Sequence, residues 1–349
     1  MIYAPIIIPT LCRYDHFVRL MESLRRNSWA KYTDIYIGVD FPPSEKYVGG
    51  YEKICKYLEG DFSEFASVTI IKRSYNLGSF ENCESIINEV MKKHDRFIRT
   101  DDDADFSPNF IEYMDKCLMR YENDPDVIAV TGYSYPIKWQ TSEGATVLKE
   151  NFSCPMWGTG FWRDKYKKIH KYISQEKGLG IDADYIIKSG GMNKMLNVAK
   201  YEFVNLCLSP EFENTLAAKM SDIAVRMYTA THDKYIIVPT TSKVRNWGFD
   251  GSGEYCQEVT IAHEGNATAK NYVYHQQPID TSDSYELIED TLNANDKNKD
   301  IMDEFDVLSP TSRLKMYAKV YLYRLTGKNS FHKLTLLTRI IKSRKGITT

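Results

Sequence analysis

Short apolar runs alternate with amphipathic segments through the first 135 residues of the chain. The apolar runs are rich in β-branched residues, which is typical of strands buried on both faces. They span residues 6–8, 34–40, 67–72, 97–100 and 127–131. Apolar residues at helical spacing predict helices over 16–26, 51–58, 86–91 and 108–121. This alternation predicts a parallel sheet with helices on both faces.

The second half of the chain is less regular, and its charge changes sign toward the C-terminus. We expect a basic helix over 166–172, a helix over 221–231 and a strand over 235–239. Residues 280–306 are acidic and polar, which predicts an exposed linker. From residue 309 onward the chain has ten lysines and arginines and no acidic residue. The predicted organisation is a catalytic domain 1–279 with halves 1–135 and 136–279, a linker 280–308 and a basic helical tail 309–349.

The basic tail also carries an apolar stripe. Its first part contains Met316, Val320 and Tyr323, and its second part contains Leu334, Leu337, Ile340 and Ile341. Such a helix can lie on anionic lipid, which would bring the protein to the cytoplasmic face of a membrane. The alternative is a packed helix with a solvated charged face.

Composition excludes some classes of function. The 349 residues carry a net charge of −2, which gives no case for nucleic-acid binding by the whole molecule. The seven cysteines are scattered without a C-x-x-C pair, so we expect a reducing compartment and no zinc or disulfide framework. The N-terminus lacks the features of a signal peptide, and no apolar run is long enough to span a bilayer. We therefore expect a cytoplasmic protein.

The strongest chemical signal is the acidic triplet Asp101, Asp102 and Asp103, which directly follows the strand at 97–100. Adjacent carboxylates repel and lose hydration when buried, so a cation usually neutralises them. Mg²⁺ and Mn²⁺ prefer carboxylate oxygens and keep positions open for phosphates. The triplet therefore indicates a metal–diphosphate site. The alternative is a solvated acidic loop before the helix that begins near Pro108.

Other polar residues are expected at the same edge of the sheet. Ligands bind beyond the carboxyl ends of parallel strands. Asp40 and Asn76 follow the second and third predicted strands, and Arg13 lies in the first strand-to-helix connection. Four separate segments thus deliver polar groups to one edge.

Four motifs together resemble GT-A-fold, nucleotide-sugar-dependent glycosyltransferases, particularly N-acetylglucosaminyltransferase I and bacterial polysaccharide enzymes related to family 2. They are the P-T-x-x-R segment 9–13, the N-x-G turn 76–78, the acidic triplet with the S-P-x-F segment 107–110, and the W-G-x-G segment 157–160. The resemblance covers about residues 5–255. It implies a Rossmann-like mixed sheet flanked by helices, with the basic helical tail as an extension.

The resemblance also implies roles for individual residues. Arg13 and Asp40 would hold the base, Asp101 would face the donor sugar, Asp102 the ribose, and Asp103 would bind Mn²⁺ or Mg²⁺. Asn76 would contact the donor. Taken singly, Arg13 could be a surface charge, Asp40 a cap, and Asn76 a residue in a left-handed turn before Gly78.

An inverting transfer needs a base away from the metal. The resemblance points to Asp222, which Ser221 would cap in the first turn of a helix. Asp222 could instead only complement the helix dipole. Asp182 and Asp184 are the reserve candidates.

Residues 246–253 contain three glycines and look like a lid over the diphosphate, with Ser252 donating to a phosphate oxygen. A plain turn is the alternative. Relatives often carry a histidine just after this segment, where this chain has Tyr255, so His263 or His275 would have to substitute as a second metal ligand. Trp157 and Trp162 could stack on sugars or pack in the core.

The predicted function is that of an inverting, metal-dependent glycosyltransferase of the hexosyltransferase type. It would move a sugar from a nucleotide-diphosphate donor, with UDP as the first choice, to a saccharide or lipid-linked saccharide during bacterial surface polysaccharide synthesis. A sugar nucleotidyltransferase is disfavoured because no G-x-G-T-R loop follows the first strand. A non-catalytic nucleotide-sugar-binding protein of the same fold is the remaining alternative.

Overall fold

The computed structural model describes residues 2–152, 154–174, 208, 219–253, 276–305 and 310–344. The chain divides into two compact units. Unit 1 comprises Met1–Lys167 and Lys234–Val307, and unit 2 comprises Lys168–Asp233 and Leu308–Thr349. The predicted boundary at residue 135 between a nucleotide-binding and an acceptor-binding half stays a prediction.

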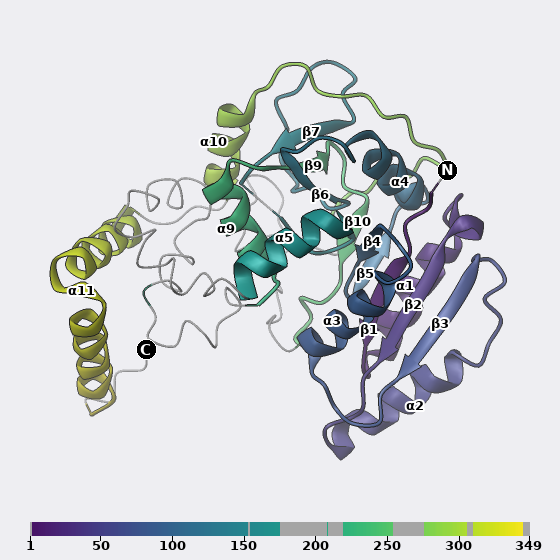
Figure 1. Ribbon diagram of the computed structural model, residues 1–349, viewed down its shortest axis with the longest axis horizontal. Helices are drawn as coiled ribbons and strands as arrows, with labels where there is room; N and C mark the ends of the chain where they lie inside the picture. The colour runs from purple at the N-terminus through teal and green to yellow at the C-terminus, as the bar shows by residue number, and fades with distance from the viewer. Residues whose placement is uncertain are drawn as a thin grey trace. The chain divides into compact units, whose positions relative to one another are not determined.

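Unit 1 is built on an eight-stranded mixed sheet (Figure 1). The strand order is β3-β2-β1-β4-β8-β6-β9-β7. The strands of this sheet are β1 Ile6–Thr10, β2 Asp34–Val39, β3 Ser67–Lys72, β4 Arg96–Arg99, β6 Val127–Thr131, β7 Val147–Glu150, β8 Thr159–Trp162 and β9 Tyr235–Pro239. A second, antiparallel sheet pairs β5 Ala104–Phe106 with β10 Val244–Asn246.

Helices flank the sheet, as predicted. The helices with residues in unit 1 are α1 Tyr14–Arg25, α2 Val48–Tyr57, α3 Ser79–Val90, α4 Phe110–Arg120, α10 Asn295–Phe305 and α5 Arg163–Ser174, which continues into unit 2; the 3₁₀ turns are Ala30–Tyr32 and Glu45–Tyr47. Unit 2 contains α9 Asp222–His232 and α11 Pro310–Arg344. Within the described residues, none of the helices combines the length and apolarity needed to cross a membrane.

Both faces of the sheet are buried because side chains alternate along each strand. Ile6 and Ile8 join the apolar core that also contains Phe17 of α1 and Met114 of α4. On the other face, Phe97 of β4 lies 5.1 Å, ring to ring, from Tyr166 of α5. The prediction of a fully buried first strand is confirmed by β1, whereas the edge strand β3 leaves Ser67, Thr69 and Lys72 exposed.

The parallel arrangement holds only for part of the sheet. β3, β2, β1 and β4 are parallel neighbours, whereas β8 lies between β4 and β6 and runs antiparallel to both. β8 includes Thr159 and Gly160 of the W-G-x-G segment, so this predicted acceptor segment also supplies a central strand. A Cβ on Gly160 would lie 2.9 Å from the terminal methyl group of Met114, so glycine leaves room there for the side chains of α4.

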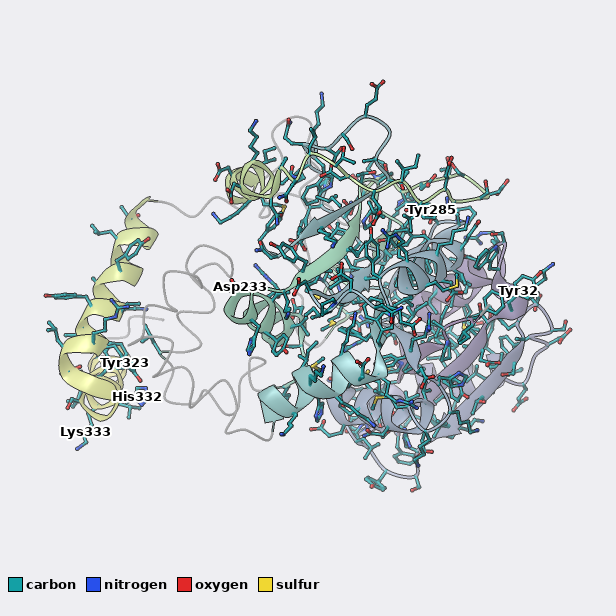
Figure 2. All side chains as sticks on the ribbon, turned by 45° about the horizontal axis from the view of Figure 1, so that its top comes forward. Tyr32, Asp233, Tyr285, Tyr323, His332 and Lys333 are labelled. Carbon is teal, nitrogen blue, oxygen red and sulfur yellow. The ribbon has the colours of Figure 1, made fainter. Side chains whose placement is uncertain are left out.

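Residues 280–290 of the predicted linker are mostly exposed, but two of them, Asp280 and Tyr285, make specific contacts with unit 1. Tyr285 is buried, and its ring meets the ring of Tyr113 edge-on at 5.1 Å (Figure 2). Asp280 accepts a hydrogen bond from Asn109 at 2.9 Å and pairs with the buried Lys243. Acidic composition suggested solvation, but Asp280 has specific partners and the one aromatic residue of the segment, Tyr285, packs on α4.

We expect Tyr285→Ala to destabilise unit 1 by about 3 kcal/mol, because truncating a buried aromatic removes apolar contacts and leaves a cavity. Denaturant unfolding measures this change. Tyr75→Ala is the matched control, because the Tyr75 side chain is 66% exposed, and it should cost less than about 0.5 kcal/mol. Equal effects of the two substitutions would contradict the packing of residues 280–290 on unit 1.

Candidate active site

The β1–α1 connection and the end of β4 meet at one charged cluster. β1 and β4 are parallel neighbours, so the segments that follow them lie side by side. Thr10 donates a hydrogen bond from Oγ1 to Asp102 Oδ2 at 2.8 Å. The Arg13 guanidinium pairs with Asp102 Oδ1 through Nη2, and with Asp103 Oδ2 through Nη1 at 2.8 Å. Arg13 and the pair Asp102 and Asp103, which were predicted from two separate motifs, are thus brought together.

Burial dominates the electrostatics of this cluster. Asp102 and Asp103 are both buried, with Asp103 8% exposed. Burial raises the pKa of Asp103 to about 7; Arg13 opposes this rise, and the neighbouring carboxylates of Asp101 and Asp102 add to it. For Arg13, burial lowers the pKa, but Asp102 and Asp103 reverse this effect and raise it above its ordinary value. The guanidinium is therefore the charge that permits these carboxylates to be buried.

A turn of the chain covers the Asp103 carboxylate. The Trp247 N–H donates to the Asp103 backbone oxygen at 2.8 Å, and the Gly248 N–H donates to Asn246 Oδ1 at 2.7 Å. A Cβ on Gly248 would lie 2.0 Å from Asp103 Oδ2, so only glycine allows this approach. The lid prediction used glycine for a close approach of the backbone to the diphosphate. In the structure, Gly248 of this segment makes a close approach to the Asp103 carboxylate.

The acidic cluster offers a divalent cation one oxygen ligand. Asp103 Oδ1 is buried and has no hydrogen-bond partner, which leaves one strong oxygen ligand unused. Within the described residues, no group of three or more histidine, cysteine or acidic side chains is arranged to hold a metal. Mg²⁺ is commonly held by one or two carboxylates together with water and phosphate oxygens. Asp103 therefore suits a cation whose remaining ligands come from a diphosphate and water.

Asp101 occupies a different environment from its two neighbours. Its side chain is 37% exposed, and its Oδ1 lies 3.7 Å from Nη2 of the buried Arg99. The three adjacent aspartates thus divide into a buried pair bound to Arg13 and a more accessible carboxylate. Asp101 is the accessible carboxylate of the three, whereas Asp102 is buried with its oxygens bonded to Thr10 and Arg13. The predicted contacts of Asp101 with the donor sugar and of Asp102 with the ribose stay predictions.

Asp40 and Asn76 organise the loops that follow β2 and β3. The buried Asp40 carboxylate accepts hydrogen bonds at 2.9 Å from the backbone N–H groups of Phe41, Leu77 and Gly78, and one at 3.2 Å from the Asn76 amide. Asp40 thus forms the backbone contacts of a cap, and its predicted contact with the base stays a prediction. The left-handed residue is Gly78, with φ 82°, rather than Asn76.

The segment predicted as a lid contacts α1. His16 Nε2 lies 2.8 Å from Asp250 Oδ2, and Ser252 donates from Oγ to Asp250 Oδ1 at 2.6 Å. Burial raises the pKa of Asp250, but hydrogen bonds from Ser252 and His16 outweigh this effect and lower it to about 2. The Arg19 guanidinium stacks on the Trp247 ring, 4.0 Å from its centroid. Ser252 therefore helps to attach this segment to α1, and its predicted phosphate contact stays a prediction.

Sequence reasoning missed Thr10, His16 and Gly248 as parts of the site. Thr10 and His16 stand within the same 9–16 segment that supplied Arg13, so the signal was present but only the arginine was used. Trp162 was left open between stacking on sugars and packing. It is buried in β8, and its Nε1–H donates to the Leu118 backbone oxygen at 3.0 Å, which assigns it to the core.

Asp222 begins α9 in unit 2, where Ser221 accepts a hydrogen bond at its Oγ from the Ala224 N–H at 3.2 Å. The predicted cap is therefore confirmed, and the role of Asp222 as a base stays a prediction. The reserve acids Asp182 and Asp184 lie outside the described residues, as do the candidate second metal ligands His263 and His275. Tyr255, which stands where relatives carry a histidine, also lies outside them.

Comparison with known proteins gives no family assignment. No protein-family model and no curated protein match the chain. Among solved structures, S. aureus TarS 1-349 is similar, with a TM-score of 0.35 and 13% identity over 51% of this chain and 52% of that chain. Its complex with UDP-GlcNAc gives a TM-score of 0.32 and 12% identity, covering 48% of each chain. Another S. aureus TarS structure gives 0.31 and 10%, covering 48% of this chain and 30% of that chain. The chain thus spans about half the length of the first of these structures, and similarity this low carries no argument about chemistry.

The raised pKa of Asp103 predicts how its replacement changes stability with pH. In the fold the carboxyl takes up a proton near pH 7, whereas in the unfolded chain it does so near its ordinary value of 3.8, so it favours the fold increasingly as pH falls from 7 toward 4. Above pH 7 its buried charge destabilises the fold. With chelator present, Asp103→Asn should therefore be more favourable relative to wild type at pH 8 than at pH 5, by on the order of 2 kcal/mol.

Denaturant unfolding of both proteins at the two pH values measures this difference. Subtracting the wild-type values cancels the contribution of Asp115, whose pKa burial also raises to about 7. The same stability difference at both pH values would contradict the raised pKa of Asp103.

Proposed function

We propose that the chain is a metal-dependent glycosyltransferase that uses a nucleotide-diphosphate sugar. The observation that carries the proposal is the unpartnered, buried Asp103 Oδ1 beside the Arg13–Asp102 pair, at the carboxyl edge of β1 and β4. The mixed sheet with its parallel β3-β2-β1-β4 part and the small β5–β10 sheet is compatible with a GT-A fold. This topology alone does not specify a reaction.

In the proposed complex, Asp103 holds Mn²⁺ or Mg²⁺ and the donor diphosphate lies against it. The cation would act as a Lewis acid that offsets the charge developing on the departing diphosphate. Arg13 keeps the buried acids in place, Asp102 faces the ribose and Asp101 faces the donor sugar. Asp40 and Asn76 shape the loops beside the base, and Ser252 lies on the segment that closes over the phosphates.

The transfer step we propose is inverting. An acceptor hydroxyl oxygen forms a bond to the anomeric carbon while the bond from that carbon to the diphosphate oxygen breaks. The bonding pair leaves with the nucleoside diphosphate, and the hydroxyl proton passes to the Asp222 carboxylate. The acceptor is proposed to be a saccharide, free or lipid-linked, in bacterial surface polysaccharide synthesis, and the donor is proposed to be a UDP-sugar.

The two alternatives are a sugar nucleotidyltransferase and a non-catalytic nucleotide-sugar-binding protein. A sugar nucleotidyltransferase would need a glycine-rich basic loop after β1, where this chain has Leu11, Cys12 and Arg13. A non-catalytic nucleotide-sugar-binding protein would share the donor site but not the base. The metal-ion test below addresses donor binding, and the base test addresses turnover, so the two together separate the candidates.

We expect one nucleotide sugar from a panel to raise the melting temperature, and to do so more strongly with Mn²⁺, because a ligand that binds only the folded state stabilises it. Asp103→Asn should abolish the Mn²⁺-dependent part of the shift. Asp105→Asn is the matched control, because Asp105 lies two residues further on and outside the Arg13 cluster, and it should retain the shift. Manganese-independent binding, or binding unaffected by Asp103→Asn, would contradict the proposed metal ligand.

We expect Asp222→Asn to lower kcat by on the order of 100-fold or more while leaving donor affinity unchanged, because it removes only the proton acceptor. Release of nucleoside diphosphate in the presence of acceptor gives kcat, and thermal shift gives donor binding. Asp233→Asn at the other end of α9 is the control, because asparagine tolerates the left-handed backbone found there (φ 50°). Normal turnover by Asp222→Asn would refute its role as base.

A further inference from the structure

The C-terminal helix α11 consists of two arms. Gly327 interrupts it with a φ of 73° and a ψ of 164°, so residues 310–326 and 328–344 run in different directions (Figure 1). The arms contact each other beside the break, where the Tyr323 and Phe331 rings lie 5.3 Å apart and both side chains are buried (Figure 2). Val320 is buried as well, three residues before Tyr323. The first arm therefore has a defined inward face.

A different set of large apolar side chains faces solvent on the first arm. Leu314, Tyr317, Tyr321 and Leu325 are between 51% and 72% exposed. They follow one another at spacings of three, four and four residues, which places them on one side of a helix. Val320 and Tyr323 of the stripe predicted from the sequence lie on the inward face, which fits the alternative of a packed helix.

Cationic side chains border the exposed stripe on both sides. At about 100° per residue, Arg324 lies beside one edge of the stripe and Lys315 lies beyond the other edge, whereas Lys319 lies nearer to the inward face. All three are exposed. Residues 310–344 contain no aspartate or glutamate. The second arm adds Lys333 beside the exposed Leu334 and Leu337.

This pattern favours one kind of partner. Exposed contiguous apolar side chains of this size mark interaction surfaces in folded proteins. A second copy docked stripe to stripe would bring cationic borders together with no acidic residue of α11 to offset them. An anionic lipid surface satisfies both features, because acyl chains take up the apolar stripe while the long lysine and arginine side chains reach the phosphate groups. The chemistry of α11 thus matches an anionic membrane better than a copy of itself.

We infer that the stripe formed by Leu314, Tyr317, Tyr321 and Leu325 is a docking surface for anionic membranes, with α11 lying in the plane of the lipid headgroups. Val320 and Tyr323 lie on the inward face, where Tyr323 packs against Phe331 of the second arm. This inference concerns unit 2 and does not depend on the transfer reaction proposed for the site in unit 1.

The test is flotation of the full chain with vesicles of phosphatidylcholine, with and without phosphatidylglycerol. We expect binding to the anionic vesicles that weakens at high salt, and much weaker binding to the neutral ones. Tyr321→Ser combined with Leu325→Ser should lower partitioning by about tenfold or more, because both side chains leave the lipid. Lys315→Gln should lower it by about fivefold.

Leu292→Ser is the matched control, because Leu292 is 59% exposed but lies in unit 1, and it should bind vesicles like wild type. Circular dichroism checks that the double variant keeps its helix content. Failure of the intact chain to bind, equal binding to both vesicle types, or an unchanged double variant would overturn the inference. Sedimentation showing a dimer that the double variant dissociates, without vesicle binding, would assign the stripe to a second copy and overturn it as well.

Discussion

Burying two adjacent carboxylates at the end of β4 is the constraint on which the candidate site depends. Asp102 and Asp103 would repel each other without a compensating charge. Arg13 supplies that charge and Thr10 supplies a hydrogen bond, so the β1–α1 connection has to lie against the end of β4. The parallel pairing of β1 with β4 is what brings the two segments within reach of each other.

Segments that are distant in sequence also pack around the buried carboxylates. Gly248 lies against the Asp103 carboxylate, and the turn that carries it follows β10, the partner of β5. β10 begins next to Lys243, whose ammonium group is buried and paired with Asp280. Asp280 therefore stabilises the start of β10 through Lys243. The sheet of β5 and β10 in turn positions Trp247 and Gly248 against Asp103. A buried lysine without this partner would be costly, which explains why Asp280 is paired at the start of an acidic segment that is otherwise mostly exposed.

The cluster also bears on the proposed chemistry. Arg13 already occupies one side of the Asp102 and Asp103 carboxylates, and Asp103 Oδ1 is left without a partner. A cation bound there would take few protein ligands and would depend on the donor diphosphate to complete its coordination. Metal and donor binding would then be coupled in the proposed reaction. The diphosphate would supply oxygen ligands to the cation, and the cation would supply positive charge to the diphosphate. Asp40, by contrast, directs its oxygens to backbone N–H groups and so sets the shape of a loop.

The sequence by itself determined the parallel strands β1 to β4, the helices on both faces, and the order in which Arg13, Asp40 and the acidic triplet reach one edge. These follow from local periodicity and from the rule that parallel strands end together. Only the tertiary structure decided the antiparallel insertion of β8, the packing of Tyr285 and the choice of which face of α11 turns inward. Each of these depends on contacts between segments far apart in the chain. Composition and spacing describe what a segment can bury, but which neighbour buries it is fixed only when the whole unit packs.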